Sequence, residues 1–437
     1  MKTPTLIICL LLSASCTAQV LTLQQCIDTA LRRNIPLRDV RLASEAADRN
    51  ADIAKAAMMP DLYGSVNQGV NFGRNVDPFT NDYVQRTIDF GSYGLSSSVT
   101  LFSGNSIRNN VKQQQLEANA SKLDIETVRQ QTRLNVTLAY LQVLSTAEQL
   151  EAVRKQALAS EEQLKRLELR KKKGVTAASQ VSDLQGQLQN EQLAIVDLQN
   201  TLEWYKMELA QHMNVPYNKD IRLQAINIDG MTKAVSQGAG NVYSRALGVL
   251  PQVRAAQLRS ESAAYRWRSA KGLRYPQVIL GGTVQTVYAS SARIASDKVA
   301  FGDQFWNNRF ATLNLGIRIP IFTGGAIRNQ IKLADVQRRR TALAEEANRT
   351  EIWRQIERAD VAMVNARQKY QALQTQISAY EVSYEAAEAR FVTGVDGSLN
   401  YLLAKNNLDR ARQNMILAKY DLVLKQQVLE YYSNGDW

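Results

Sequence analysis

An internal duplication constrains the fold of this chain more than any other feature of its sequence. Five residues of one segment recur 220 positions later: Phe102, Gly104, Ile107, Arg108 and Asn109 return as Phe322, Gly324, Ile327, Arg328 and Asn329. The same offset still holds where Gly174 and Leu188 match Gly394 and Leu408. Loops accept insertions and packed elements do not, so an offset constant over about 70 residues predicts one long uninterrupted helix in each half.

An earlier part of each half also repeats, but with a different offset. Ala30 and Pro60 match Ala246 and Pro276, which lie 216 positions further on. The second copy has therefore gained four residues between the equivalents of Pro60 and Phe102. Since insertions belong in loops, we expect this segment to form two strands joined by a long connection.

These offsets divide the chain into segments. Each repeat is expected to contain a short helix, a β-hairpin, a long helix and a second helix. The expected ranges are a signal segment at 1–18, a first repeat at 19–215 (hairpin about 60–103, helices 105–173 and 178–215), a connector at 216–240, a second repeat at 241–433 (hairpin about 276–323, helices 325–393 and 398–433) and a tail at 434–437.

The first 18 residues have the pattern of a secretory signal. Lys2 precedes an apolar run from Leu6 to Leu12, and small residues continue to Ala18. Two alternatives remain open: cleavage after Ala18, or lipid attachment at Cys16 of a bacterial lipoprotein. Cys9 and Cys16 both lie in the signal segment, so Cys26 is the only cysteine that follows it and no internal disulfide is expected.

The hairpins alternate between apolar and polar side chains. Leu313, Leu315 and Ile317 alternate with polar or small residues, and Leu95 and Val99 do so in the first copy. A half-buried sheet of a soluble domain would show the same alternation. Strands of about ten residues, with aromatic residues near their ends, instead favour strands that cross a bilayer. Four strands cannot close a membrane barrel, whose minimum is about eight, so several copies must contribute.

The helical segments predict coiled-coil hairpins. Leu150, Ala157 and Leu164 follow one another at intervals of seven, which indicates a packed seam. Each long helix is expected to end at a glycine, Gly174 or Gly394, with positive φ. The next helix is expected to restart from an N-cap serine, at Ser179 or Ser398 in the respective copies. Such short turns join antiparallel helices.

Catalytic signals are weak in this sequence. His212 is the only histidine, which excludes histidine-based metal sites and histidine-assisted nucleophiles, and no glycine-rich segment carries a phosphate-binding lysine. We therefore expect no enzyme activity, no cofactor and no metal. The net charge of +12 is interpreted as solvated helix faces rather than as a nucleic-acid surface, with a positive lumen around Arg318 as the alternative.

Three sets of motifs together resemble the TolC family of outer-membrane efflux proteins. They are the opening segment Leu21–Asn34 (LTLQQCIDTALRRN), the paired turns TLFSGNSIRN and PIFTGGAIRN, and the tips KKGVTAASQVSDLQ and FVTGVDGSLNYLLA. The paired turns contain Gly104, Arg108, Gly324 and Arg328. The resemblance covers nearly the whole chain after the signal, with all elements in order.

The resemblance implies a mainly α fold with a transmembrane β-hairpin pair. It implies a homotrimer, with a 12-stranded barrel in the outer membrane of a Gram-negative bacterium on a 12-helix periplasmic tube. The implied function is a passive exit duct for small molecules, metal ions or proteins. The implied partners are two further copies, a periplasmic adaptor protein, an inner-membrane pump and outer-membrane lipid. The alternative is a secreted, soluble coiled-coil scaffold without transport activity.

The resemblance also implies a constriction at the periplasmic tips. The family often carries aspartates there, but the corresponding positions are Asn400 and Leu403 in this sequence. We expect Asn400, Tyr401 and Leu403 to line the constriction, with Asp396 as its only nearby charge. The residues expected opposite them on the first tip are Ser179 and Gln180. Such a tip should respond less to divalent cations than one lined by carboxylates.

Overall fold

The fold is seen in a computed structural model that describes residues 20–77, 79–226, 238–295 and 297–435. The expected signal segment, Cys16 and part of the expected connector lie outside these residues. The chain forms two compact units. One contains the chain up to Val40, Ile125–Pro251 and Arg349–Trp437, and the other contains Arg41–Asp124 and Gln252–Asn348. Each unit therefore combines parts of both sequence repeats.

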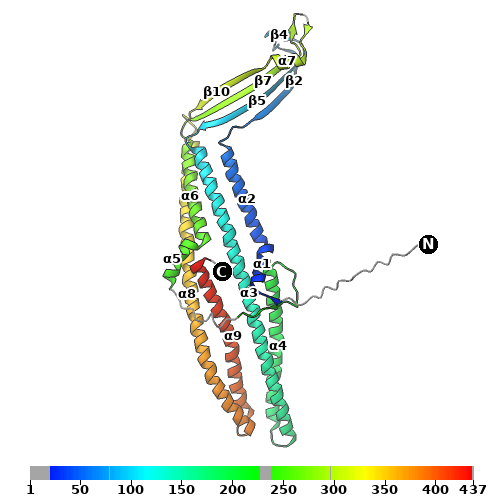
Figure 1. Ribbon diagram of the computed structural model, residues 1–437, viewed down its shortest axis with the longest axis vertical. Coiled ribbons are helices and arrows are strands. Elements are labelled where there is room, and N and C mark those ends of the chain that lie inside the picture. Colours follow the sequence, from blue (N-terminus) through cyan, green and yellow to red (C-terminus); the bar gives the residue numbers. More distant parts are fainter. Residues whose placement is uncertain (1–19, 78, 227–237, 296, 436–437) are drawn as a thin grey trace, which may run out of the picture. The chain divides into compact units, whose positions relative to one another are not determined.

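The structure is mostly helical, and the two repeats have matching helices. The helices of the first repeat are α1 (Leu23–Arg33), α2 (Ile35–Ala56), α3 (Ser106–Lys172) and α4 (Ala178–His212). Those of the second are α5 (Ala239–Val249), α6 (Pro251–Gly272), α8 (Ala326–Thr393) and α9 (Ser398–Asn434). Figure 1 labels these helices along the chain. No helix among the described residues has both the length and the apolar composition needed to cross a membrane.

Two consecutive helices stand in each repeat where the sequence predicted one short helix. Leu250, between α5 and α6, has an extended conformation with ψ 123° because the residue before a proline, here Pro251, avoids helical geometry. In the first repeat, Asn34 interrupts the helix with ψ 120°, and its side-chain oxygen accepts the backbone N–H of Leu37 at 2.7 Å. The prediction of a single helix was therefore wrong in both copies.

One antiparallel sheet contains the four long strands, in the order β10-β7-β5-β2. The strands are β2 (Tyr63–Asn71), β5 (Ile88–Phe102), β7 (Gln277–Ala289) and β10 (Phe310–Arg318). Figure 1 shows them side by side. Among the described residues, both β2 and β10 have a neighbouring strand on one side only, and every residue of β10 is exposed.

The strand register separates an apolar face of this sheet from a polar face. Leu315 lies opposite Leu280, and Leu280 opposite Val99, on the apolar face. The polar face carries hydroxyl and amide side chains, among them Asn67, Ser92, Ser96, Thr283, Gln285, Thr312 and Asn314, and it ends at Arg318. The predicted alternation is thus preserved across all four strands.

Short elements complete the fold. In the long connections, β3 (Arg74–Val76) pairs with β4 (Tyr83–Gln85), and β8 (Arg293–Ile294) pairs with β9 (Asp297–Lys298). The connection of the second copy also contains α7 (Phe301–Asn307), which has no counterpart among the described residues of the first connection. In the other unit, β1 (Val20–Leu21) pairs in parallel with β6 (Arg222–Leu223), and the buried Tyr140 hydroxyl donates to the Gln224 carbonyl at 2.6 Å.

The predicted coiled-coil seam is buried. Leu150, Ala157 and Leu164 on α3 are buried, as are the intermediate positions Val153, Ser160 and Leu167. Near the end of α3, Leu164 and Leu167 pack in one apolar cluster with residues of α4, α8 and α9. This packing stabilises α-helices of such length, since helix stability in proteins comes chiefly from tertiary packing.

The two strand–helix turns differ in how tightly they are packed. Gly104 and Gly324 have nearly the same left-handed conformation, with φ 59° and 60°. A Cβ atom added at Gly104 would clash with the Gly272 carbonyl oxygen and lie 2.7 Å from the Tyr275 Cβ, whereas one added at Gly324 would meet no atom within 4 Å. The duplication thus provides a packed turn and an open turn with the same backbone.

This difference predicts the effects of matched alanine substitutions. Gly324→Ala should destabilise the fold by about 1–2 kcal/mol because of the left-handed backbone. Gly104→Ala should cost more than Gly324→Ala, because the clash adds to the same backbone strain. Gly186→Ala, at an open position inside α4, should leave the stability unchanged or raised by up to about 1 kcal/mol. Thermal unfolding of the purified variants measures this order, and equal losses at Gly104 and Gly324 would contradict it.

Candidate functional site at the helical tips

Each long helix ends in a glycine turn. Gly174 has φ 73° and Gly394 has φ 82°, the left-handed conformation that the sequence predicts. The backbone N–H groups of Val175 and Val395 donate to the carbonyl oxygens of Arg170 and Arg390 at 3.1 and 3.0 Å. These bonds satisfy carbonyl groups that would otherwise be unpaired at a helix end. The turns therefore reverse the chain between α3 and α4 and between α8 and α9.

The serines at the start of the following helices do not cap them, so this prediction was wrong. Ser179 is the second residue of α4, and the residue before that helix is Ala177. Ser398 is the first residue of α9, and its hydroxyl donates to the Asp183 carboxylate on α4 at 2.7 Å. The serine thus joins the two helical hairpins instead of closing its own helix.

Further contacts join the two tips. The Arg170 guanidinium donates to the Val392 carbonyl oxygen at 2.8 Å. Phe391 on α8 stacks on Tyr401 on α9, with ring centroids 4.7 Å apart and an interplanar angle of 11°. Tyr401 belongs to the same apolar cluster as Val181 and Leu184 of α4. Within one chain, the two hairpin ends therefore form a single packed body.

The residues expected to line a constriction have different environments. Asn400 and Leu403 are exposed, as is Ser179, and Gln180 is half-buried. Tyr401 is only 2% exposed. A side chain that lines an opening must be exposed in the isolated chain, so we assign Tyr401 to packing within the tip.

The charge of Asp396 is compensated within the same turn. Its carboxylate accepts a hydrogen bond from the Arg390 Nε at 2.9 Å. Asp183 likewise accepts a hydrogen bond from Ser398, although its side chain lies on the other hairpin. The sequence did not indicate Arg170 and Asp183, because only the folded chain brings the two tips together. Arg390 was also missed, although it lies only six residues before its partner Asp396.

A buried charge cluster lies further along α4 and α9. The Lys405 ammonium donates to Glu191 at 2.6 Å and to Asp409 at 2.7 Å. The Lys405 and Glu191 side chains are both less than a tenth exposed. Gln187 donates to the bonded oxygen of Glu191, but the second oxygen, Oε2, is buried and has no hydrogen-bond partner in the part of the chain that the structure describes. The cluster thus contains two carboxylates and one cation.

Burial and neighbouring charges act in opposite directions on Lys405. Burial lowers the pKa of Lys405, but the two carboxylates outweigh this effect, and the net pKa lies above its ordinary value of 10.5. The stabilisation from this lysine is therefore complete below pH 10.5 and is lost as the pH rises through the higher folded-state pKa. Burial also raises the pKa of Asp409. That group therefore opposes folding once the pH exceeds its ordinary pKa, and Lys405 must offset this cost.

The sequence contained a partial signal for this cluster. Lys405 and Asp409 are spaced by four residues on one helix, a spacing that favours an ion pair. Surface pairs at this spacing are common, so the spacing alone does not indicate burial. Glu191 completes the cluster from another helix, and its position became known only from the tertiary structure.

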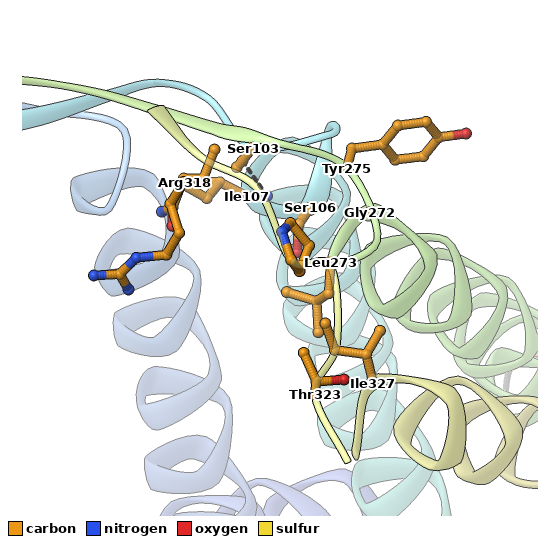
Figure 2. A pocket seen from close by; sticks show the side chains of 11 residues that line it. Ser103, Ser106, Ile107, Gly272, Leu273, Tyr275, Arg318, Thr323 and Ile327 are labelled. Carbon is orange, nitrogen blue, oxygen red and sulfur yellow. Dashed lines mark hydrogen bonds between the residues drawn. The ribbon is translucent and has the colours of Figure 1, made fainter. Parts of the chain in front are cut away.

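A cavity at the strand–helix turns is lined by residues of both predicted turn motifs and by Arg318. It has a volume of about 420 Å³ and is lined by Ser106, Ile107, Tyr275, Arg318 and Ile327, among others. Figure 2 shows the Arg318 guanidinium extending away from the Thr323 and Ile327 side chains. The predicted turn residues Arg108 and Arg328 are exposed and do not line this cavity. The cavity holds no cluster of groups suited to catalysis.

Removing Lys405 should destabilise the helical unit strongly. Lys405→Met leaves buried carboxylates without their cation, a change that typically costs about 3–5 kcal/mol. Lys165→Met removes an exposed lysine that pairs with Glu161, so little change is expected from this control. Chemical denaturation of both variants measures the difference.

The effect of Lys405→Met should also depend on pH. The unfolded chain loses the lysine charge above pH 10.5, whereas the folded chain keeps it until its higher pKa is reached. The stability gap between wild type and Lys405→Met should therefore narrow above pH 10.5. A gap that stays constant between neutral pH and pH 11.5 would show that the lysine acts through packing alone.

Comparisons with known proteins agree with this architecture. A family model described as outer membrane efflux protein matches residues 26–214 and 242–435. The outer membrane efflux protein BepC of Brucella suis biovar 1 is 25% identical over 409 residues, which cover 93% of this chain and 84% of that protein. The CusC structure has a TM-score of 0.82 at 18% identity and covers 95% of this chain and 92% of that chain. The VceC structure from Vibrio cholerae has a TM-score of 0.81 at 17% identity, with coverage of 95% and 96%.

Proposed function

The chain belongs to the outer membrane efflux protein family, and on this basis we propose that it is the passive exit duct of a tripartite export system. Members of this family are located in the outer membrane of Gram-negative bacteria, with a large periplasmic helical part, and they are efflux channels rather than enzymes. In our proposal the chain moves small molecules, metal ions or proteins from the periplasm to the exterior without changing them chemically.

The observation that carries this proposal is the open four-stranded sheet. Its edge strands β2 and β10 each leave a row of backbone groups without a partner strand. Such groups cannot face hydrocarbon, because each one costs several kcal/mol when unsatisfied. The four strands alternate in direction, so β2 of one copy runs antiparallel to β10 of the next. Identical copies can therefore be joined in a ring through one repeated contact.

We propose three copies, the number that the resemblance to the family implies. They give twelve strands, above the minimum of about eight for a membrane barrel. The apolar face of the sheet then contacts lipid, and the polar face lines the lumen. Several helices also leave large apolar side chains exposed in the single chain, among them Leu193, Trp204, Leu333, Leu343, Val361 and Val382. These exposed side chains support a tube of twelve long helices, in which neighbouring copies would bury them.

The helical tips are the proposed docking surface for a periplasmic adaptor protein, which links the duct to an inner-membrane pump. Val175, Val395 and Leu399 are large apolar residues that stay exposed at the two turns. Large apolar residues that are exposed at one end of a protein are suited to contact with a partner protein. The pump must supply the energy, because the chain has no nucleotide-binding motif of its own.

The assembly can be tested on purified protein. We expect extraction only with detergent, a mass of three chains, and conductance after insertion into a planar lipid bilayer. A proline at the centre of β10, Leu315→Pro, should abolish the assembly, because it removes a backbone donor and kinks an edge strand that must pair. A wild-type protein that is monomeric and soluble without detergent would instead support the secreted scaffold.

The tip should conduct with little sensitivity to divalent cations. Asn400 and Leu403 carry no charge, and Asp396 is paired with Arg390, so a ring of these residues offers no free carboxylates. The double variant Asn400→Asp, Leu403→Asp should create a ring of free carboxylates and make the conductance sensitive to Mg²⁺. Single-channel recordings with and without Mg²⁺ compare the two proteins, and strong block of the wild type would contradict this prediction.

A further inference from the structure

Helix α7 lies on the apolar face of the sheet. The Thr286 hydroxyl donates to the Phe305 carbonyl oxygen at 2.9 Å, and the Tyr288 ring lies 5.2 Å from the Phe301 ring. Thr286 and Tyr288 occur on β7 at the same alternate positions as Leu280 and Val284, which defines the apolar face. Under the proposed function this face contacts lipid, so α7 packs on the outside of the barrel.

Along the strands, α7 lies at the end of the sheet that is farther from the long helices. The buried Gln304 side chain accepts from the backbone N–H of Ala289 at 3.0 Å and donates to its carbonyl oxygen at 3.1 Å. Ala289 is the last residue of β7, whereas α6 ends just before the first residue of this strand. Figure 1 shows α7 beside this end of the sheet. In the proposed orientation, α7 lies at the level of the outer leaflet.

An apolar groove adjoins α7 on this face. It has a volume of about 390 Å³, and its lining includes Val66, Tyr93, Leu95, Val284, Phe305 and Arg309. The uncharged residues of this list come from the adjacent strands β2, β5 and β7 and from α7. Arg309 is the only charged residue of the lining. The groove therefore has a mainly apolar lining with one cation, Arg309.

Arg309 is held in a defined orientation. Its Nε donates to the Trp306 carbonyl oxygen at 2.7 Å, and its guanidinium carbon lies 4.6 Å from the centre of the Trp306 ring. The Trp306 side chain is 60% exposed. No carboxylate in the described ranges forms an ion pair with Arg309. The terminal nitrogens of this guanidinium are thus available to an external anion, and planar guanidinium groups bind phosphate well.

We propose that this groove binds a phosphate-bearing lipid of the outer leaflet, with an acyl chain along Val66, Leu95 and Val284 and the phosphate at Arg309. The inference rests on the proposed function, because only a sheet embedded in the membrane presents this face to lipid. The charge of the groove selects an anionic headgroup. Aromatic residues such as Trp306 and Tyr93 favour the boundary between hydrocarbon and headgroups.

Native mass spectrometry of the delipidated, detergent-purified trimer tests this site. Lipid A is added with both phosphates or after removal of its phosphates. We expect up to one phosphorylated lipid per chain and at least tenfold weaker binding of the dephosphorylated lipid. Arg309→Gln should lower affinity for the phosphorylated lipid about 10- to 100-fold, since hydrogen bonds to charged groups contribute about 1.5–3 kcal/mol. Arg318→Gln is the matched control, because Arg318 lies on the opposite face, and it should bind lipid as the wild type does.

Two further measurements test whether binding needs the apolar groove in addition to Arg309, and whether a free anion can replace the lipid. Leu95→Trp should fill the groove and weaken binding of the phosphorylated lipid, although Arg309 remains. Inorganic phosphate at millimolar concentration should not displace the lipid, because it gains nothing from the apolar lining.

The outcomes distinguish this inference from the proposed function. A detergent-dependent trimer that binds the lipid equally well with Arg309→Gln refutes the lipid site alone, as does displacement by inorganic phosphate. A wild-type protein that remains monomeric and water-soluble refutes the proposed function and the lipid site together. Selective loss of binding in Arg309→Gln and Leu95→Trp, with no loss in Arg318→Gln, supports the site.

Discussion

The unpaired backbone groups along β2 and β10 are the constraint on which the rest of this structure depends. A four-stranded antiparallel sheet with one apolar face can leave its edges in water, but not in hydrocarbon. Membership of the outer membrane efflux protein family places the chain at the membrane. The edges then demand partner strands, and the alternating strand directions allow identical copies to supply them. In the proposed assembly, closure of the sheet by further copies is a requirement of backbone hydrogen bonding rather than an addition to a finished fold.

The helical tips combine two kinds of packing with different consequences. The cluster around Tyr401 and Leu184 is apolar and tolerates changes of similar volume. The Lys405 cluster is ionic and buried, so loss of Lys405 leaves two buried carboxylates without their cation. Together they join the two hairpins within one chain. The exposed residues Asn400 and Leu403 remain available for contacts between chains, which is why the proposed constriction rests on them and not on Tyr401.

Much of the fold was predictable because its signals are local or repeated. Helix length followed from the constant offset, the glycine turns from residue type, and the two sheet faces from alternation along single strands. Other features failed for a physical reason. Ser398 was a reasonable N-cap by type, but its hydroxyl finds Asp183 on another helix. Tyr401 was expected at an opening, yet Phe391 and the α4 cluster bury it.

By itself, the sequence determined the duplication, the order of the elements, the ends of the long helices and the faces of the strands, because these depend on residues near one another in the chain. Only the tertiary structure decided that Glu191 joins Lys405, that Gly104 is packed and Gly324 is open, and that α7 covers the apolar face beside Arg309. Each of these depends on contacts between segments far apart in sequence, where side-chain volume and distance in space, rather than residue pattern, select the partner.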